Sequence, residues 1–195
     1  TIGADGPNKV LSRVYKREHV NNIVQHYFAV INRYVDVPPD CNVAYVMEKS
    51  KPTEYRNKIK DGIHIVFPHI IVSNNVQHFI RKKILDIAQE MFMCLPISNE
   101  YASVIDKAII DVNCWLMYGS KKIETDCYRV SNIYKYDDKA TEKTQLITDP
   151  ITATDEIGFI KLFSMRKKDS SRTPIRSEYA GEVDEYIKHI LPSID

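Results

Sequence analysis

The spacing of hydrophobic residues predicts two long amphipathic helices in this chain. The first begins near Lys16, and its apolar residues recur three and four positions apart, as on one face of a helix. They are Val20, Ile23, Val24, Tyr27, Phe28, Ile31 and Val35. The second covers residues 73–95, with Ser73 or Asn74 as its N-terminal cap. Its apolar face comprises Val76, Phe79, Ile80, Lys83 or Ile84, Ile87, Met91 and Cys94.

Short runs rich in β-branched and aromatic residues predict strands between and after these helices. The runs are residues 43–49, 63–68, 114–119 and 127–136. The first two can pair as an antiparallel hairpin across residues 50–62, a polar and basic connection, and the last two are expected to be partners. Strands interspersed with helices predict an α/β or α+β fold, in which helices pack on a mixed or antiparallel sheet.

The C-terminal part predicts a helix over residues 151–168, capped by Thr154 or Asp155. A polar stretch, residues 169–181, is typical of a flexible linker, and a short amphipathic helix follows at residues 182–190.

Composition indicates a globular protein without an overall nucleic-acid signature. Of the 195 residues, 44% are hydrophobic and 27% charged, and the formal net charge is +1. Any nucleic-acid role must therefore come from local clusters of basic residues. The four cysteines lack metal-ligand spacing, which favours free thiols in a reducing compartment: Cys41, Cys94, Cys114 and Cys127. No apolar run reaches the roughly 20 residues that span a bilayer.

A histidine inside an apolar strand is the first candidate for chemistry. Side chains alternate along a strand, so Ile63, Ile65 and Phe67 share one face and His64 lies on the other. Gly62 before it permits close approach of a ligand to the backbone. Spacing alone favours a half-buried imidazole satisfied by its neighbours; the alternative is an imidazole that donates to a phosphate oxygen.

Two aspartates and a basic turn are further candidates. Asp106 and Asp111 each follow an apolar pair, where a carboxylate can bind Mg²⁺ or cap a turn. Gly119 permits an unusual turn, after which Ser120, Lys121 and Lys122 suit a triphosphate or a nucleic-acid backbone. The alternative is a hairpin turn with solvated lysines. Two basic clusters, residues 81–83 and 165–168, are typical of solvated helix faces, or of contacts to a single strand when aromatic residues lie between them.

Along the chain, a Gly-x-His strand is followed by a long helix, by an aspartate after an apolar pair and by a strand that ends in a Ser/Lys turn. This order resembles the archaeo-eukaryotic primase superfamily, and within it the primase domain of poxvirus-type primase–helicases of large DNA viruses. The matching segments are "AYVMEK", "KDGIHIVFPHI", "VIDKAIIDVNCWLMYGSKK" and "GFIKLFSMRKK". The resemblance implies that residues 1–175 form a primase-like catalytic domain. Residues 176–195 would then be a linker and a C-terminal helix.

The resemblance also implies roles for individual residues. His64 would contact the phosphates of the incoming nucleotide, and Asp106 would be a metal-binding carboxylate, with Asp111 ranked second. Phosphate or template would bind at Ser120, Lys121 and Lys122, with Lys60 as a further basic contact. The first family motif, an acidic D-x-D pair on a strand, has no counterpart here and is expected upstream of Thr1, so the core would be incomplete at its N-terminus.

These roles predict a DNA primase that uses Mg²⁺ or Mn²⁺ for template-directed nucleotidyl transfer. Its partners would be a single-stranded DNA template, nucleoside triphosphates and a fused or associated helicase. The location would be a viral replication site in the host cytoplasm, with no membrane contact. A non-catalytic module that binds single-stranded DNA or a protein partner is the alternative, and a metal-dependent nuclease is a third possibility.

Overall fold

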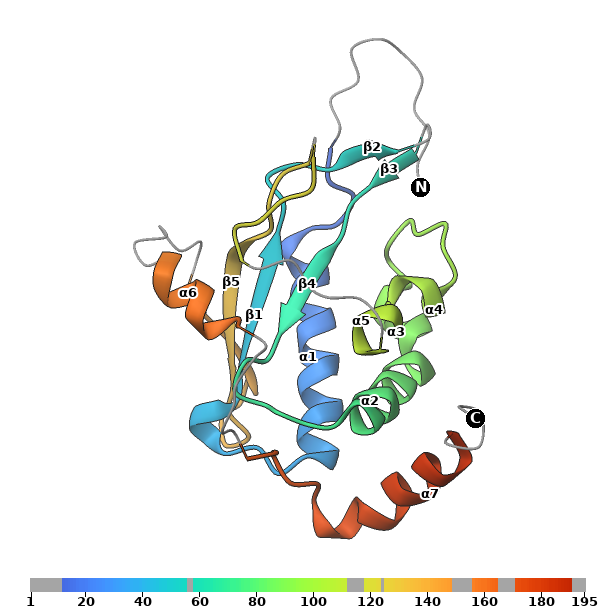
Figure 1. Cartoon of the computed structure of the whole chain (residues 1–195). Coiled ribbons are helices and arrows are strands. Elements are labelled where there is room, and N and C mark those ends of the chain that lie inside the picture. The colour runs from blue at the N-terminus through green and yellow to red at the C-terminus, as the bar shows by residue number, and fades with distance from the viewer. Residues whose placement is uncertain are drawn as a thin grey trace.

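Four antiparallel strands form the central sheet of the computed structural model, in the order β4–β1–β5–β6 (Figure 1). The structure describes residues 12–55, 58–111, 118–123, 125–148, 156–164 and 171–190. The strands are β1 (Val43–Glu48), β4 (Ile63–Val66), β5 (Arg129–Tyr136) and β6 (Thr144–Thr148). Tyr45 lies opposite Val66, which confirms the predicted antiparallel pairing of β1 with β4. The expected class, helices packed on a mixed or antiparallel sheet, is also confirmed.

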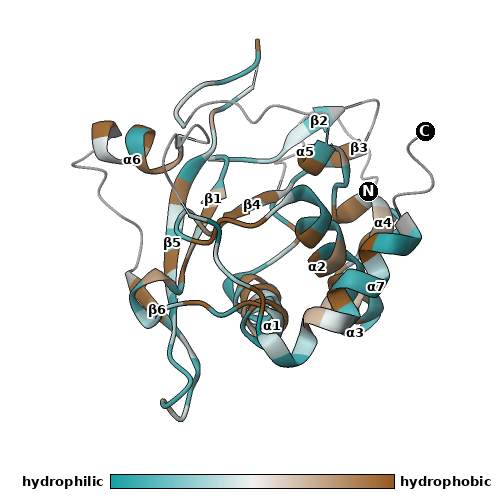
Figure 2. Ribbon diagram, turned by 60° about the horizontal axis from the view of Figure 1, so that its bottom comes forward, coloured by the Kyte–Doolittle hydropathy of each residue, from teal (hydrophilic) through white to brown (hydrophobic). Residues whose placement is uncertain are grey.

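Helices cover both faces of this sheet. One face carries α1 (Arg17–Tyr34) and α2 (Asn74–Asp86), with α3 (Ala88–Phe92) and α7 (Ala180–Ile190) in the same layer, whereas α6 (Glu156–Leu162) lies on the opposite side (Figure 2). Short 3₁₀ turns occur at Pro39–Cys41 and Ser177–Tyr179. Within the ranges described, no helix has both the length and the apolar character needed to cross a membrane.

The predicted apolar face of α1 forms the centre of the core. Val24 and Phe28 are fully buried and pack with β1 and β5 residues, including Val46 and Tyr134. The Phe28 ring lies 5.4 Å from that of Phe67 in an edge-on arrangement. Such burial contributes about 1.5–3 kcal/mol for each large apolar side chain, so the helical periodicity of this segment is explained by its packing on the sheet.

The second predicted helix is interrupted. Ser73 caps α2 as expected, because its hydroxyl accepts from the backbone N–H of Val76. The helix then breaks at Ile87, and α3 ends at Phe92, so Cys94 is exposed rather than on the buried face. Buried residues continue across the break, at Ala88 and Met91 as well as Phe92, and for this reason the hydrophobic pattern did not reveal it.

The connection between β1 and β4 contains a hairpin that the sequence did not predict. Strands β2 (Thr53–Tyr55) and β3 (Lys58–Lys60) pair as a separate antiparallel ribbon. Each strand is three residues long and mostly polar, so neither shows the alternation of apolar and polar residues that marks a half-buried strand.

The segment predicted as a flexible linker packs against the rest of the chain. The backbone N–H of Thr173 donates to the carbonyl of Ile71 over 2.7 Å. Arg176 donates from its backbone to the carbonyl of Tyr34 and from Nε to that of Asn32, both over 2.9 Å. The carbonyls of Asn32 and Tyr34 lie in the last turn of α1, where carbonyl groups lack partners within the helix. The prediction of a flexible linker was therefore wrong for residues 173–176, because Arg176 donates hydrogen bonds to carbonyl groups at the C-terminal end of α1.

Helix α7, predicted at residues 182–190, packs on α2. Val183 is 2% exposed, and the ring of Tyr186 lies 5.4 Å from that of Phe79. The Tyr186 hydroxyl also donates to the carbonyl of His78 over 3.2 Å. Hence α7 contributes to the same apolar cluster as α1 and α2.

Some predicted features lie outside the described residues. They include residues 114–117 of the strand expected at residues 114–119, the proposed caps Thr154 and Asp155, and the basic cluster at residues 165–168. Cys114 is also outside. The other three cysteines are free thiols, as predicted: Cys41, Cys94 and Cys127.

Candidate functional site

His64 lies on the sheet face that carries α6. On β4 it is opposite Met47, and Met47 belongs to a buried cluster that Phe159 of α6 and Phe163, just after this helix, contact. Val66 packs against the same cluster, whereas Ile63 and Ile65 pack against the clusters under α1. The predicted alternation along this strand is therefore confirmed.

The imidazole of His64 is half-buried and stacked on an aromatic ring. Its centroid lies 3.7 Å from that of Tyr128, with 13° between the planes. The ammonium of Lys49 is 5.3 Å from the centre of the same ring. Burial, and secondarily the positive charge of Lys49, lowers the pKa of His64 to about 4. At neutral pH this histidine is thus an uncharged hydrogen-bonding group.

An ionic cluster borders this histidine and was missed by the sequence analysis. Arg13 donates to Glu48, to the hydroxyl of Tyr15 and, over 2.6 Å, to the carbonyl of Lys49. Its Nε lies 3.6 Å from Oδ2 of Asp61. The Tyr15 hydroxyl donates to Glu48 over 2.8 Å. We call Arg13, Tyr15, Glu48 and Asp61 the Arg13 cluster.

Burial dominates the ionisation of the Arg13 cluster. It raises the pKa of Asp61, against the lowering effects of Arg13 and of the Gly62 N–H that donates to the carboxylate over 3.0 Å. It also raises the pKa of Tyr15, and Glu48 adds to that rise. In the sequence, Glu48 at the end of β1 and Asp61 just before β4 are recognisable as charged residues at strand ends. Their positions do not indicate that Arg13 is their partner.

The turn that carries Ser120 lies on the same face as His64. Gly119 has a φ of +79°, a conformation that favours glycine. The Tyr118 ring lies 5.4 Å from the rings of Phe159 and Phe163, and its hydroxyl accepts from the N–H of Val130 over 3.3 Å. Tyr118 and the stacking partner of His64 belong to the same aromatic cluster.

The basic residues near this face are exposed. Ser120, Lys121 and Lys122 directly follow Gly119 and are open to solvent. Lys60 is exposed at the end of β3, and two residues, Asp61 and Gly62, separate it from the strand that carries His64. His64 and the turn are thus brought to one side of the sheet.

The two candidate aspartates lie beside α2, a helix of the layer on the face opposite to His64, so the described residues do not bring them into contact with His64 or with the turn at residues 118–122. Asp106, in the connection between α4 (Tyr101–Val104) and α5 (Ala108–Asp111), is exposed, and its Oδ1 accepts from the N–H of Ala108 over 2.9 Å. Oδ1 of Asp111 lies 2.7 Å from Nε2 of His78 on α2. Both side chains therefore have structural partners, and for Asp106 this is the turn-capping role considered as its alternative. Throughout the described ranges, no three His, Cys, Asp or Glu side chains are grouped to hold a metal ion.

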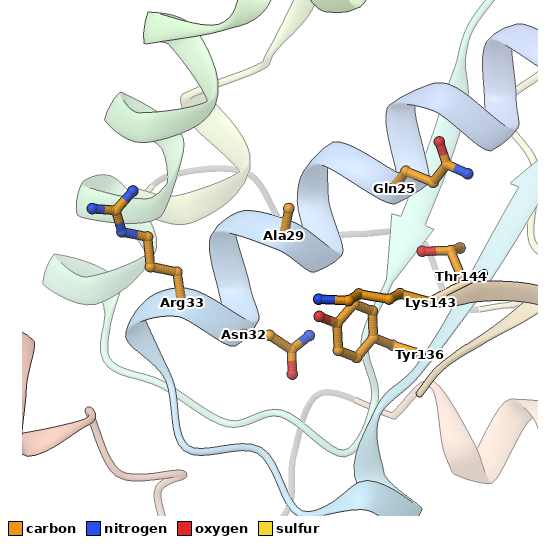
Figure 3. A pocket seen from close by; sticks show the side chains of 7 residues that line it. All are labelled: Gln25, Ala29, Asn32, Arg33, Tyr136, Lys143 and Thr144. Carbon is orange, nitrogen blue, oxygen red and sulfur yellow. The ribbon is translucent and has the colours of Figure 1, made fainter. Parts of the chain in front are cut away.

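A pocket of about 490 Å³ opens between α1 and the β5–β6 edge (Figure 3). Six of its seven lining residues have side chains with a polar group: Gln25, Ala29, Asn32, Arg33, Tyr136, Lys143 and Thr144, of which Ala29 is the exception. In Figure 3 the side chains of Lys143 and Tyr136 lie together, while Arg33 points away from them. None of the site residues predicted from the sequence lines this pocket. The pocket lies beside α1 rather than on the sheet face that carries α6.

Comparison with known families and proteins points to one group. The family described as the C962R protein N-terminal AEP domain, where AEP denotes the archaeo-eukaryotic primase type, matches residues 4–134. A protein of Acanthamoeba polyphaga mimivirus named putative helicase L207/L206 is 31% identical over 131 residues. That alignment covers 66% of this chain and 14% of the mimivirus protein. No solved structure matches the chain.

Proposed function

Because this chain belongs to the archaeo-eukaryotic primase superfamily, in the family of the C962R protein N-terminal domain, we propose that it is the primase domain of a viral DNA primase–helicase. The whole protein then catalyses template-directed nucleotidyl transfer. A 3′-hydroxyl attacks the α-phosphate of a nucleoside triphosphate, and pyrophosphate leaves. The observation that carries this proposal is the common sheet face of His64 and the turn at residues 118–122.

In this proposal the residues of that face bind and orient the triphosphate. The neutral imidazole of His64 donates a hydrogen bond to a phosphate oxygen. Ser120 contributes its hydroxyl, and Lys121 and Lys122 contribute charge, which makes their hydrogen bonds to phosphate stronger than neutral ones. Lys60, exposed at the end of β3, is a further basic contact.

The proposed cofactor is Mg²⁺ or Mn²⁺, with Asp106 and Asp111 as candidate ligands. When bound, such ions neutralise the charge of the phosphates and activate the attacking hydroxyl. A two-ion site requires carboxylates from more than one segment, and the described residues hold no group of three potential ligands. The two aspartates would supply only part of such a site.

The proposed partners follow from the same family membership. They are a single-stranded DNA template, nucleoside triphosphates and a fused helicase, the last supported by the name of the mimivirus relative. The proposed location is a viral replication site in the host cytoplasm. The chain spans a small share of that relative's length, so these assignments concern the whole protein.

Primer synthesis by the full-length protein tests this function. We expect Asp106→Asn to abolish synthesis from a single-stranded template with Mg²⁺ or Mn²⁺. Asp138→Asn is the matched control, because Asp138 is exposed in the loop between β5 and β6, and it should retain wild-type synthesis. Wild-type synthesis by Asp106→Asn would refute the assignment of this carboxylate.

A second candidate is a module that binds single-stranded DNA without catalysis. The partners of Asp106 and Asp111, the Ala108 N–H and His78, favour it because they give both carboxylates a structural role. It predicts DNA binding by a full-length protein that makes no primers with either ion. A nuclease would instead degrade labelled DNA with Mn²⁺ in the absence of nucleotides.

A further inference from the structure

The strongest unassigned feature is the arrangement of two side chains around Tyr128. This tyrosine directly precedes β5 and is half-buried on the face that carries α6. His64 is stacked on its ring at 3.7 Å, and Lys49 lies 5.3 Å from the ring centre. One aromatic side chain therefore contacts residues that come from the ends of two different strands.

The backbone of Lys49 is held in place by the Arg13 cluster. The carbonyl of Lys49 accepts a hydrogen bond of 2.6 Å from Arg13. The guanidinium of Arg13 also faces the carboxylates of Glu48 and Asp61. Among the described residues, no carboxylate forms an ion pair with the ammonium of Lys49, and its partner is an aromatic face. The positive charge of Lys49 also acts on Asp61, whose pKa it lowers, but without an ion pair among the described residues it can still bind an anionic ligand.

We propose that Tyr128 is a positioning residue that orients His64 and Lys49 toward the phosphates of a nucleotide, Lys49 supplying charge and His64 a hydrogen bond. This inference rests on the proposed function and adds two residues, Tyr128 and Lys49, to its phosphate site. A stacked ring restricts rotation of the imidazole, so less freedom is lost when the ligand binds.

The proposed roles, Lys49 as the source of charge and His64 as a neutral hydrogen-bonding group, agree with the charges that surround the imidazole. Lys49 is the cation that acts on His64, and with burial it lowers the pKa of the histidine. Asp61 and Arg13 act on Tyr128 with opposite signs, and burial raises the pKa of this tyrosine. At neutral pH the arrangement therefore presents one cation, Lys49, and one neutral imidazole.

A set of variants of this chain separates positioning from general packing. Tyr128→Phe keeps the ring and removes the hydroxyl, whereas Tyr128→Leu removes the ring. Tyr45→Leu is the matched control, because Tyr45 lies on the same face but contacts Phe159 and Phe163 instead. Lys49→Met removes the charge and keeps most of the apolar stem.

The first measurement is an NMR pH titration of the His64 imidazole, with His64→Gln used to assign its signals. We expect a pKa near 4 in the wild type and in Tyr128→Phe, and a rise toward the ordinary value in Tyr128→Leu, because water then reaches the ring. Tyr45→Leu should titrate like the wild type. A titration in Tyr128→Leu that is unchanged from the wild type would overturn the positioning role.

The second measurement is the binding of ATP, with and without Mg²⁺, and of inorganic triphosphate. Loss of a hydrogen bond between charged groups corresponds to about tenfold or more in affinity, so we expect such a loss for Lys49→Met and a measurable loss for Tyr128→Leu. Tyr128→Phe and Tyr45→Leu should bind normally. Equal affinity in Lys49→Met and the wild type, or no binding by the wild type, would overturn the inference.

Primer synthesis distinguishes this inference from the proposed function. Full-length protein that synthesises primers normally with Lys49→Met and Tyr128→Leu would overturn the inference and leave the enzyme intact. Triphosphate binding that depends on both residues, in a full-length protein that makes no primers, would support the binding site and overturn the enzymatic function.

Discussion

Removing Arg13 should destabilise the fold, because two carboxylates depend on its guanidinium. Arg13 contacts Glu48 and lies 3.6 Å from Asp61, and the three side chains are 23%, 17% and 6% exposed, respectively. Breaking a fully buried ion pair costs about 3–5 kcal/mol. Since water reaches part of this cluster and screens it, we expect Arg13→Ala to cost about 2–3 kcal/mol at neutral pH.

Urea denaturation at two pH values tests the electrostatic origin of this loss. Without Arg13 the carboxylate of Asp61 loses the charge that lowers its pKa, so its pKa in the folded state rises further above the unfolded value. A carboxyl whose pKa is raised by folding reduces stability as the pH rises through that range. The cost of Arg13→Ala should therefore be largest at pH 7 and smaller near pH 4.

Two controls make the outcome specific to charge. Arg13→Met removes the guanidinium but retains most of the apolar stem. If the guanidinium is responsible for the stability, this variant should be nearly as destabilising as Arg13→Ala. Arg172→Ala changes an exposed arginine and should stay within about 0.5 kcal/mol of the wild type. A cost for Arg13→Ala below that limit at pH 7, or the same cost at both pH values, would refute the reasoning.

Three further changes have defined expectations. His64→Ala in the full-length protein should weaken nucleotide binding by about 1.5–3 kcal/mol, measured by calorimetry; unchanged affinity would remove His64 from the site. Val183→Ala should lower the free energy of unfolding by about 2 kcal/mol, because Val183 is 2% exposed between α7 and its neighbours; no change in urea denaturation would argue against docking of α7. Gly119→Ala should cost about 1–2 kcal/mol, since its φ of +79° is unfavourable for a residue with a Cβ, and a denaturation midpoint equal to that of the wild type would contradict this.

Local patterns were sufficient to predict the main elements of the fold. The periodicity of α1, the Ser73 cap of α2 and the pairing of β1 with β4 are all confirmed. Each depends on neighbours within a few positions or on alternation along one strand, and such signals can be read directly from residue order. The orientation of His64, opposite to Ile63 and Ile65, follows from the same alternation.

Other features depend on contacts between distant residues and were visible only in three dimensions. Arg13 meets Glu48 across 35 positions of sequence, and Tyr128, which directly precedes β5, stacks on the imidazole of His64 on β4. Thr173 and Arg176 bind distant backbone carbonyls, although their segment has the composition of a linker. The energy of each contact depends on the burial and the partner that the folded chain provides, and neither is encoded by local spacing.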